Sequence, residues 1–369
     1  MKIEATHKFS LGALSEKEAK SLSVLELIRK KNVVSRKDIS NATGVNIVSI
    51  SNYVKDFMEA NLLLEEGIDV STGGRKPELI ELNTKENYAL GIEAGEGVWR
   101  SSLINIGLKK ICGSERQARE FSGKNIPAIL EDIAEDLAGK AGIKLQHIRA
   151  TGIAIADDAS TLNAEELEKN LGSNFYVCDN VICAAFGEKY LNIKCAAEEL
   201  LYIYSDLGAA LVLKGGNLKP SDGGDSKYLK SWSRYFSMEE MARREVAKGV
   251  GTRMVALAGG DARRITKHVV IEAARQNDEA ALNILSGVGM NLGFRISYLI
   301  NLFKPEAVLI NGGIEAAGEL LLSPIKKAVK KFALKSRLKK IDITPGILGD
   351  DAVNLGAASL AVREIFLKA

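Results

Sequence analysis

A run of sixteen residues, YVCDNVICAAFGEKYL at positions 176–191, places polar side chains where a strand-like pattern passes into a helical one. Asp179 and Asn180 stand at this junction, and an Ala-rich helical pattern follows them. A carboxylate here can take a proton from a substrate hydroxyl, whereas an amide cannot, because it has no protonation step near neutral pH. The run is therefore a candidate catalytic site, active only if Asp179 is the base.

Length and composition indicate an ordinary soluble protein of more than one domain. The chain has 369 residues, and a single hydrophobic core rarely organises so many, so about two or three domains are expected. No apolar run reaches the roughly 20 residues of a membrane span, and the N-terminus lacks the apolar core of a secretory signal. The net charge of +3 neither requires nor excludes nucleic acid. We expect a cytoplasmic protein without contact to a membrane.

Cysteine and histidine positions do not predict a metal site. The four cysteines (Cys112, Cys178, Cys183 and Cys195) form no C-x-C or C-x-x-C pair, and the three histidines are far apart in the sequence. Buried, reduced thiols are the simpler interpretation. We expect neither a metal nor another cofactor.

Three helical patterns with very short breaks follow one another from Ser21 onward. Ser35 is suited to cap the second pattern, which ends at Gly44, a residue that readily adopts the left-handed conformation of a helix stop. Asn46 is suited to cap the third. Two helices joined by a turn of about four residues around a glycine are typical of the helix-turn-helix, whose second helix enters the major groove of DNA.

The polar face of the third helical pattern is expected to read DNA. Short side chains at its start allow close approach to base edges. The predicted DNA-binding residues of the helix pair are Ser35, Arg36, Asn46, Ser49, Ser51, Asn52 and Lys55.

Two strand-like runs after the helices enclose a basic turn, STGGRKP. Gly73 and Gly74 permit a tight reversal, and Arg75 and Lys76 carry positive charge to the tip. Such a hairpin is typical of a wing that lies near phosphates or in the minor groove, so both cations are predicted to bind DNA. Acidic and basic side chains balance over residues 1–87, so affinity should depend on a few well-placed cations and on dimerisation. A helical module that binds protein is the alternative.

Beyond Asn87 the pattern changes to strands that alternate with helices. A strand, a glycine-containing turn and further strands open this region, and a similar start recurs from Leu200. Amphipathic helical patterns follow at residues 126–142 and 278–303. This repeated arrangement predicts two similar α/β lobes with a cleft between them.

Two long stretches resemble the ROK family of repressors, open reading frames and kinases. One runs from EAARQNDEAALNILSG to AVLINGGI and continues with LGDDAVNLGAASLAV; the other joins STGGRKPELIELN to YALGIEAG. The similarity covers nearly the whole chain from about Ser21. It implies an α/β class, two-lobed, actin-like sugar-kinase fold preceded by a winged helix-turn-helix domain.

The turns that bind ATP in ROK kinases are altered in this chain. The first resembles D-x-G-G-T in the family and matches residues 93–97, where Glu96 brings a carboxylate towards the phosphate oxygens. The second resembles G-T-G-I-G-A-G and is replaced by residues 205–210, with a further carboxylate at Asp206. Like charges repel, so poor binding of ATP is expected. The retained Gly312-Gly313 turn is interpreted as structural.

The family's catalytic run resembles N-D-A-N-A-A-A-L-G-E. Alignment on Ala184 to Glu188 places Asn180 at the catalytic aspartate and Asp179 at the residue before it. The resemblance therefore implies a protein without kinase activity. A shift of one residue would make Asp179 the base, so an active sugar kinase is the alternative.

The sugar and zinc motifs of the family are altered as well. Residues 225–228 read DSKY where the family has E-x-G-H, and the cysteine-rich zinc loop is absent, with Glu239 near the position of its glutamate. Carboxylates and amides suit recognition of sugar hydroxyls. Candidate effector-binding residues are therefore Asp179, Asn180, Asp225 and Glu239; the alternative is a solvated loop edge left by a decayed site.

Together these patterns predict an N-terminal arm at residues 1–20, a winged helix-turn-helix domain at 21–87, a first lobe at 88–200 that the helix of residues 353–369 rejoins, and a second lobe at 201–352. The predicted function is DNA-binding transcriptional regulation, as a repressor. The expected partners are a double-stranded DNA operator, a sugar-like effector, and further copies of the chain in a homodimer or homotetramer.

Overall fold

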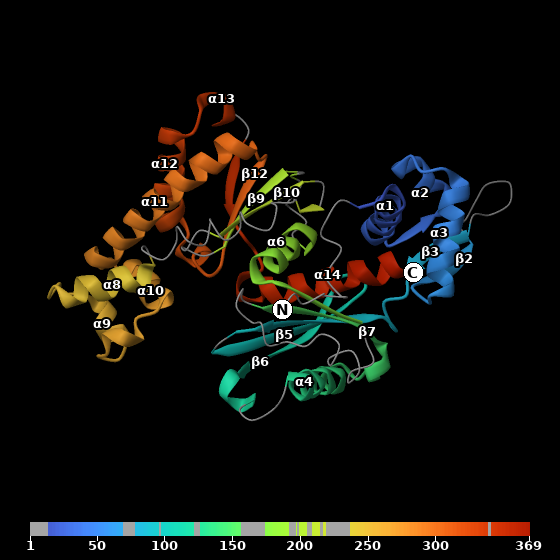
Figure 1. Ribbon diagram of the computed structural model, residues 1–369, viewed down its shortest axis with the longest axis horizontal. Coiled ribbons are helices and arrows are strands. Elements are labelled where there is room, and N and C mark those ends of the chain that lie inside the picture. Colours follow the sequence, from blue (N-terminus) through green and yellow to red (C-terminus); the bar gives the residue numbers. More distant parts are fainter. Residues whose placement is uncertain are drawn as a thin grey trace, which may run out of the picture. The chain divides into compact units, whose positions relative to one another are not determined.

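Helices and strands alternate along most of the chain, which confirms the predicted α/β class (Figure 1). The computed structural model describes residues 14–68, 78–95, 97–121, 126–155, 174–191, 197, 199–204, 209–214, 217–218, 237–338 and 341–369. The chain divides into one unit of Met1–Leu191 with Val353–Ala369 and a second unit of Asn192–Ala352.

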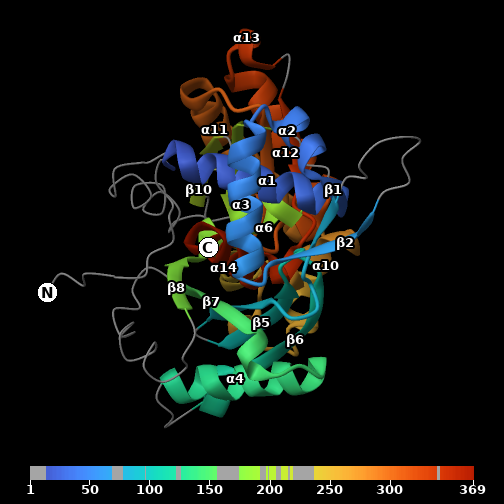
Figure 2. The ribbon, with the colours of Figure 1, turned by 90° about the vertical axis from the view of Figure 1, so that its right-hand side faces the viewer.

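The first unit begins with three helices and a small sheet. Its elements are α1 (Glu16–Lys31), β1 (Val33–Ser35), α2 (Arg36–Thr43), α3 (Ile47–Glu59), β2 (Leu63–Ile68) and β3 (Glu78–Leu82). The sheet has the order β1-β3-β2, and both pairings are antiparallel. This succession of elements is that of a winged helix, with β2 and β3 as the two strands of the wing (Figure 2).

Local capping explains where these helices begin and end. Ser15 and Glu18 form a capping box, in which Glu18 N donates to Ser15 Oγ and Ser15 N donates to the Glu18 carboxylate at 2.7 Å. Helix α1 therefore begins at Glu16, upstream of the start predicted from the sequence. Ser35 caps α2, and Gly44 ends it with a φ of 70°, as predicted.

A five-stranded sheet follows in the first unit. Its strands are β4 (Tyr88–Ala94), β5 (Val98–Asn105), β6 (Lys110–Gln117), β7 (Ile148–Ile155) and β8 (Asn174–Asp179), in the order β6-β5-β4-β7-β8. β5 pairs antiparallel with both β4 and β6, whereas β7 lies parallel to β4 and β8. Short 3-10 turns occur at Ala118–Phe121 and Leu145–His147.

Helices cover both faces of this sheet. In Figures 1 and 2, α4 (Ile126–Ala141) lies on one face, while α6 (Asn180–Leu191) and α14 (Ala352–Lys368) lie on the other. Apolar residues of α4, including Leu130 and Leu137, share a buried core with Leu90 and Leu103 of the sheet.

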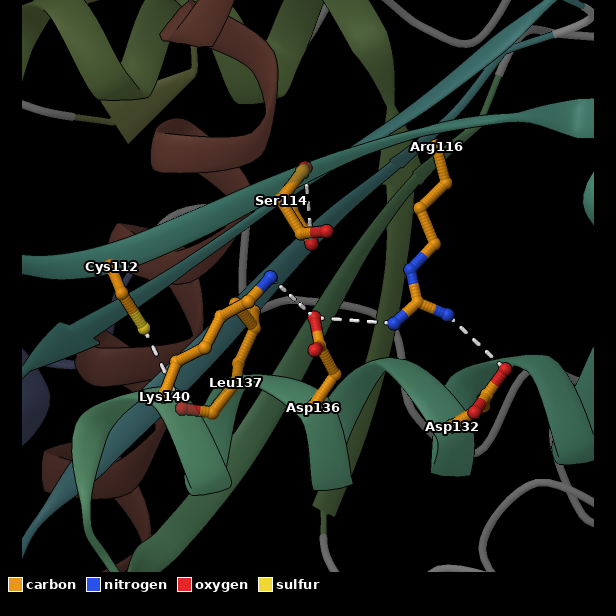
Figure 3. Close-up of polar contacts among 8 residues, drawn as sticks. Cys112, Ser114, Arg116, Asp132, Asp136, Leu137 and Lys140 are labelled. Atoms are coloured by element: carbon orange, nitrogen blue, oxygen red, sulfur yellow. Dashed lines mark hydrogen bonds and ion pairs between the residues drawn. The ribbon is translucent and has the colours of Figure 1, made fainter.

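Arg116 ties the edge strand β6 to α4. Its guanidinium lies 3.2 Å from the carboxylates of both Asp132 and Asp136, and Lys140 lies 2.7 Å from Asp136 (Figure 3). The hydrogen bond from Lys140, together with Arg116, lowers the pKa of the Asp136 carboxyl. Exposed ion pairs contribute little individually, so their main effect here is to orient the helix on the sheet.

Glycines allow α14 to approach its neighbours closely. A Cβ added to Gly91 in β4 or Gly152 in β7 would overlap backbone atoms of α14. On α14 itself, a Cβ added to Gly356 would overlap the carbonyl oxygen of Cys183 in α6. Helix α14 therefore packs so closely on its neighbours that only glycine fits at positions 91, 152 and 356.

The winged helix is held against the rest of the first unit by buried contacts. The rings of Phe57 in α3 and Phe366 in α14 meet edge to face, with 5.1 Å between their centroids. At the end of α3, Arg149 Nη2 donates to the carbonyl oxygen of Ala60 at 3.3 Å. The position of α3 is thus coupled to that of α14.

The second unit contains a sheet of the same topology. Its strands are β9 (Glu199–Tyr204), β10 (Ala209–Lys214), β11 (Asn217–Leu218), β12 (Ala307–Asn311) and β13 (Asp342–Pro345), in the order β11-β10-β9-β12-β13. As in the first sheet, three strands are antiparallel and the last two are parallel to the central one. The repeat agrees with the predicted pair of similar lobes.

The helices of the second unit are α8 (Met238–Ala247), α9 (Arg253–Leu257), α10 (Lys267–Arg275), α11 (Glu279–Phe303), α12 (Glu319–Phe332) and α13 (Lys335–Leu338), with 3-10 turns at Ala262–Arg264, Glu315–Ala317 and Gly349–Asp351. Their apolar faces join β9 and β12 in one buried core. Within the described ranges of the whole chain, no helix combines the length and apolar character needed to cross a membrane.

Candidate DNA-binding and effector sites

The start of α3 presents a mixed polar and apolar surface. Asn46 caps the helix, and its Oδ1 accepts from Val48 N at 2.8 Å. Ile47 is 45% exposed and Val48 is 64% exposed. Neither was predicted as a DNA-binding residue, because apolar type in a helical pattern indicates a core position. Only their exposure identifies them as candidates.

Further along α3, the exposed side chains continue on the same face. Val48, Asn52 and Lys55 are all exposed and are spaced four and three residues apart, so they share one side of the helix. Lys55 lies 3.7 Å from Glu59. Ser51, in contrast, donates to the backbone of its own helix at 2.9 Å.

Two predicted DNA contacts at the start of α2 have partners inside the protein. Ser35 is only 5% exposed and caps α2, with its Oγ 2.6 Å from Asp38. Arg36 pairs with Glu65 of β2 at 2.9 Å and with Glu78 of β3 at 2.7 Å. These contacts favour a role in holding α2 to the wing strands. Ser49 is half-buried, and Arg75 and Lys76 lie outside the described residues.

The candidate catalytic run lies where β8 passes into α6. Asp179 ends the strand, and its Oδ1 accepts from Val181 N at 2.8 Å, as a helix cap does. The Oδ1 of Asn180 is buried and has no hydrogen-bond partner among the described residues. Burial raises the pKa of the Cys183 thiol well above its ordinary value, and the hydrogen bond with Cys178 adds to this rise. That thiol is therefore not a nucleophile.

Glu93, at the first phosphate turn, is held by its own sheet. It is 8% exposed and faces Arg100 across β4 and β5, with 3.9 Å between the guanidinium and the carboxylate. Gly95 follows, where a Cβ would come within 2.5 Å of the Val98 carbonyl oxygen, so glycine is required by packing alone. The two carboxylates predicted to repel ATP, Glu96 and Asp206, lie outside the described residues.

In the second unit, Glu239 and the Gly312-Gly313 turn are both linked to the start of α10. Glu239 Oε1 accepts from Lys267 N at 3.2 Å, and Lys267 Nζ donates to the Gly312 carbonyl oxygen at 2.6 Å. Burial raises the pKa of the nearby Glu315 carboxyl. Glu239 therefore has a structural partner in addition to its proposed effector role.

The candidate effector residues are distributed over both units. Asp179 and Asn180 belong to the first unit and Glu239 to the second. Asp225 lies outside the described residues. In the part of the chain that the structure describes, no three side chains of His, Cys, Asp or Glu are grouped so that they could hold a metal ion.

Residues 245–364, which include α10, α11, α12 and most of α14, match the model of the ROK family. This stretch is similar to the ROK family domain. The resemblance drawn from the sequence motifs is thereby confirmed, and the matched residues include the Gly312-Gly313 turn of the second unit.

Relatives match nearly the whole chain. The xylose repressor of Caldicellulosiruptor bescii is 22% identical, over 95% of this chain and 96% of its own length. The DNA-binding transcriptional dual regulator NagC of Escherichia coli is 21% identical, over 94% of this chain and 93% of its own length. The similarity therefore includes the winged helix as well as the residues that match the ROK family model.

Solved structures confirm the predicted fold. A ROK family transcriptional regulator, a homologue of the Escherichia coli Mlc protein, superposes with a TM-score of 0.74 at 19% identity, covering 95% of this chain and 98% of its own. A ROK glucokinase from Streptomyces griseus, in complex with glucose and AMPPNP, has a TM-score of 0.60 at 19% identity, covering 74% of this chain and 99% of its own. The fold is thus that of the ROK regulators and sugar kinases.

Proposed function

We propose that the protein is a DNA-binding transcriptional regulator of the ROK type and acts as a repressor. The observation that carries the proposal is the exposed face of α3 in a winged helix that buried contacts hold on the first lobe. The names of full-length relatives, a xylose repressor and NagC, support this function. A cytoplasmic location is part of this proposal.

In this proposal α3 lies in the major groove. Asn52 and Ser49 read base edges, and Lys55 with the wing residues Arg75 and Lys76 contacts phosphates. The exposed side chains of Ile47 and Val48 supply apolar surface that suits the C5-methyl groups of thymine. Ser35 caps α2 and Arg36 holds α2 to the wing strands, so neither residue contacts a base in this proposal.

The lobes do not transfer phosphoryl groups in this proposal. Asp179 serves as the cap of α6, and the amide of Asn180 stands where ROK kinases are expected to have their base. A coupled assay for ATP consumption over a panel of sugars tests this. Turnover by the wild-type protein that disappears in Asp179→Asn would establish a sugar kinase instead. No turnover of any sugar by a wild-type protein with the expected helix content in circular dichroism supports the regulator.

The effector is proposed to be a sugar-like molecule, with Asp179, Asn180, Asp225 and Glu239 as its candidate ligands. The names of two relatives, which refer to xylose and N-acetylglucosamine, support this class of ligand. An effector that binds one arrangement of the lobes more tightly shifts the population towards it and so changes operator affinity.

Homodimers, or homotetramers built from them, are proposed to present two reading helices to one operator. An apolar surface on the second unit supports self-association: Phe294, Tyr298 and Leu302 of α11 are each 54% exposed, and Phe294 packs edge to face on Phe332 of α12. Contiguous exposed apolar residues of this kind commonly mark an interface between subunits.

A gel-shift experiment tests the central proposal. The full chain is incubated with the DNA upstream of its own gene and with random DNA, at rising salt. Retardation of the upstream fragment at salt that releases random DNA is expected, because base contacts add to the phosphate contacts that salt weakens. Failure to retard any fragment from the genome would favour a scaffold that binds protein.

A further inference from the structure

A cavity lies between the winged helix and the first lobe, within the first unit. It has a volume of about 40 Å³ and is lined by residues of α1, α6 and α14 and of the turn after β5. Its walls are mostly apolar and include Leu22, Leu25, Ile106 and Val362, but Arg29 and Arg363 also line it. Two guanidinium groups beside so small an apolar space are unfavourable unless acceptors satisfy their N–H groups.

Arg363 of α14 is buried, and the residues that the structure describes offer its guanidinium no hydrogen-bond acceptor. The residue is 4% exposed, and its Nε, Nη1 and Nη2 atoms have no hydrogen-bond partner among the described residues. Its guanidinium lies 5.6 Å from the ring centre of Phe186, which offers a cation-π contact but no acceptor for the five N–H groups. A buried cation without acceptors is strongly unfavourable, so this position favours an anion that can accept its hydrogen bonds.

Among the described residues, neighbouring carboxylates form no hydrogen bond with Arg363. Arg29 uses its own donors on Glu26 at 2.6 Å and on the carbonyl oxygen of Tyr190 at 3.2 Å. The Glu26 carboxylate is thereby committed to Arg29. Among the lining residues, two guanidinium groups face one carboxylate. The carboxylate of Glu18 lies near enough to interact with the charge of Arg363, but it accepts its hydrogen bonds from Ser15 and none from Arg363.

The hydroxyl of Ser359 also has a partner already, because it donates to the carbonyl oxygen of Leu355 at 2.8 Å. The cavity volume of about 40 Å³ is a few times the roughly 10–15 Å³ that one water molecule requires. A single carboxylate or phosphate group matches both this volume and the planar fork of a guanidinium.

We propose that this cavity is a binding site for a small oxyanion, a carboxylate or a phosphate group, held by the guanidinium of Arg363. Because α1 belongs to the winged helix and α14 to the first lobe, the bound oxyanion stabilises the docking of one on the other. This site does not depend on the proposed DNA-binding function, and it is separate from the candidate effector residues at the start of α6.

Thermal unfolding of the full chain in sodium chloride, sodium acetate and sodium phosphate, at one pH and one ionic strength, tests the proposal. Acetate or phosphate is expected to raise the Tm in a saturable way, by roughly 1–3 °C at tenfold excess over the Kd, since a ligand that binds only the native state stabilises it. Comparison of the two salts distinguishes a carboxylate site from a phosphate site.

Arg363→Met and Arg244→Met are the matched variants. Arg244 is an exposed residue of α8 that pairs with Glu240, so its replacement leaves the cavity unchanged. The oxyanion-dependent rise in Tm should be lost in Arg363→Met and retained in Arg244→Met. Equal rises in wild type and Arg363→Met would reflect general salt effects and water in the cavity, and would overturn the proposal.

If Arg363→Met does not fold, calorimetric titration of the wild-type protein decides the question. Acetate or phosphate should bind saturably with one site per chain, whereas chloride at equal ionic strength should give no comparable binding isotherm. The absence of any saturable oxyanion binding would overturn the proposal.

Discussion

Phe57 of α3 and Phe366 of α14 meet edge to face, with 5.1 Å between ring centroids and an angle of 85° between the ring planes. Both residues are 1% exposed. Edge-to-face aromatic pairs add to the stabilisation that burial provides. This pair joins α3, the helix proposed to read DNA, to α14 of the first lobe. A change in the packing of α14 therefore acts directly on α3.

Removal of the Phe366 ring is expected to loosen this junction. Phe366→Ala should lower the free energy of unfolding by about 3–5 kcal/mol, because it removes a large buried side chain and leaves a cavity. Urea unfolding measures the change. Leu145→Ala is the control, since Leu145 is 42% exposed, and it should change stability far less. Equal losses in both variants would contradict the coupling of α3 to α14.

The close approach of α14 to α6 predicts a large difference between two glycine substitutions. Gly356→Ala places a Cβ onto the carbonyl oxygen of Cys183 and should cost more than about 3 kcal/mol or prevent folding. Gly139→Ala in α4, where a Cβ meets nothing within 4 Å, should stabilise the protein by about 0.5–1 kcal/mol. Thermal unfolding of both variants checks the prediction, which a Gly356→Ala protein of wild-type stability would refute.

Asp278 predicts a dependence of stability on acid. Burial raises the pKa of its carboxyl, but the N–H groups of Arg253 and Ala281 and the hydroxyl of Thr252 donate to it and lower the pKa below its ordinary value. The resulting stability is present above the unfolded pKa of about 3.9 and is lost as the pH falls through the lower folded value.

Asp278→Asn should therefore destabilise the protein at pH 7 by about 1–3 kcal/mol, because one acceptor oxygen is replaced by a donor. The difference from wild type should shrink towards pH 3. Urea unfolding at both pH values measures it, with the exposed Asp342→Asn as control. If the difference in the free energy of unfolding between wild type and Asp278→Asn is the same at both pH values, the ionised carboxylate of Asp278 is not the source of the stability.

Base-reading and phosphate-binding residues should differ in their effects on DNA affinity. Asn52→Ala and Ser49→Ala should change sequence preference, with losses of about 1–3 kcal/mol on the operator, while Arg75→Ala and Lys76→Ala should weaken binding to every sequence and reduce its salt dependence. Gel shifts with operator and random DNA measure both quantities. Identical losses on the two DNAs for all four variants would contradict this division.

The exposed Val48 predicts recognition of a thymine methyl group. Replacement of the contacted thymine by uracil should weaken operator binding about fourfold, or ~0.8 kcal/mol, because one buried methyl is lost. Val48→Ala should bind less tightly and should no longer distinguish uracil from thymine. Val250→Ala, on the second unit, serves as the control. If Val48→Ala still discriminates between the two bases as wild type does, the methyl contact is wrong.

The amino-acid sequence by itself determined the features that depend on neighbours along the chain. Ser35 and Asn46 cap helices through bonds to residues two or three positions away, and Gly44 ends α2, so each was predictable from its local sequence. Periodicity likewise predicted α11 and β12. The early start of α1 was missed, although Ser15 and Glu18 have the spacing of a capping box.

Only the tertiary structure decided which side chains are free to act. Arg36 has the type of a DNA contact, but its partners Glu65 and Glu78 lie 29 and 42 residues away in the sequence and engage it. The exposure of Val48 and the burial of Arg363 likewise depend on elements from distant parts of the chain. A sequence pattern specifies the chemistry and spacing of side chains, whereas their burial and pairing arise only when distant elements pack together.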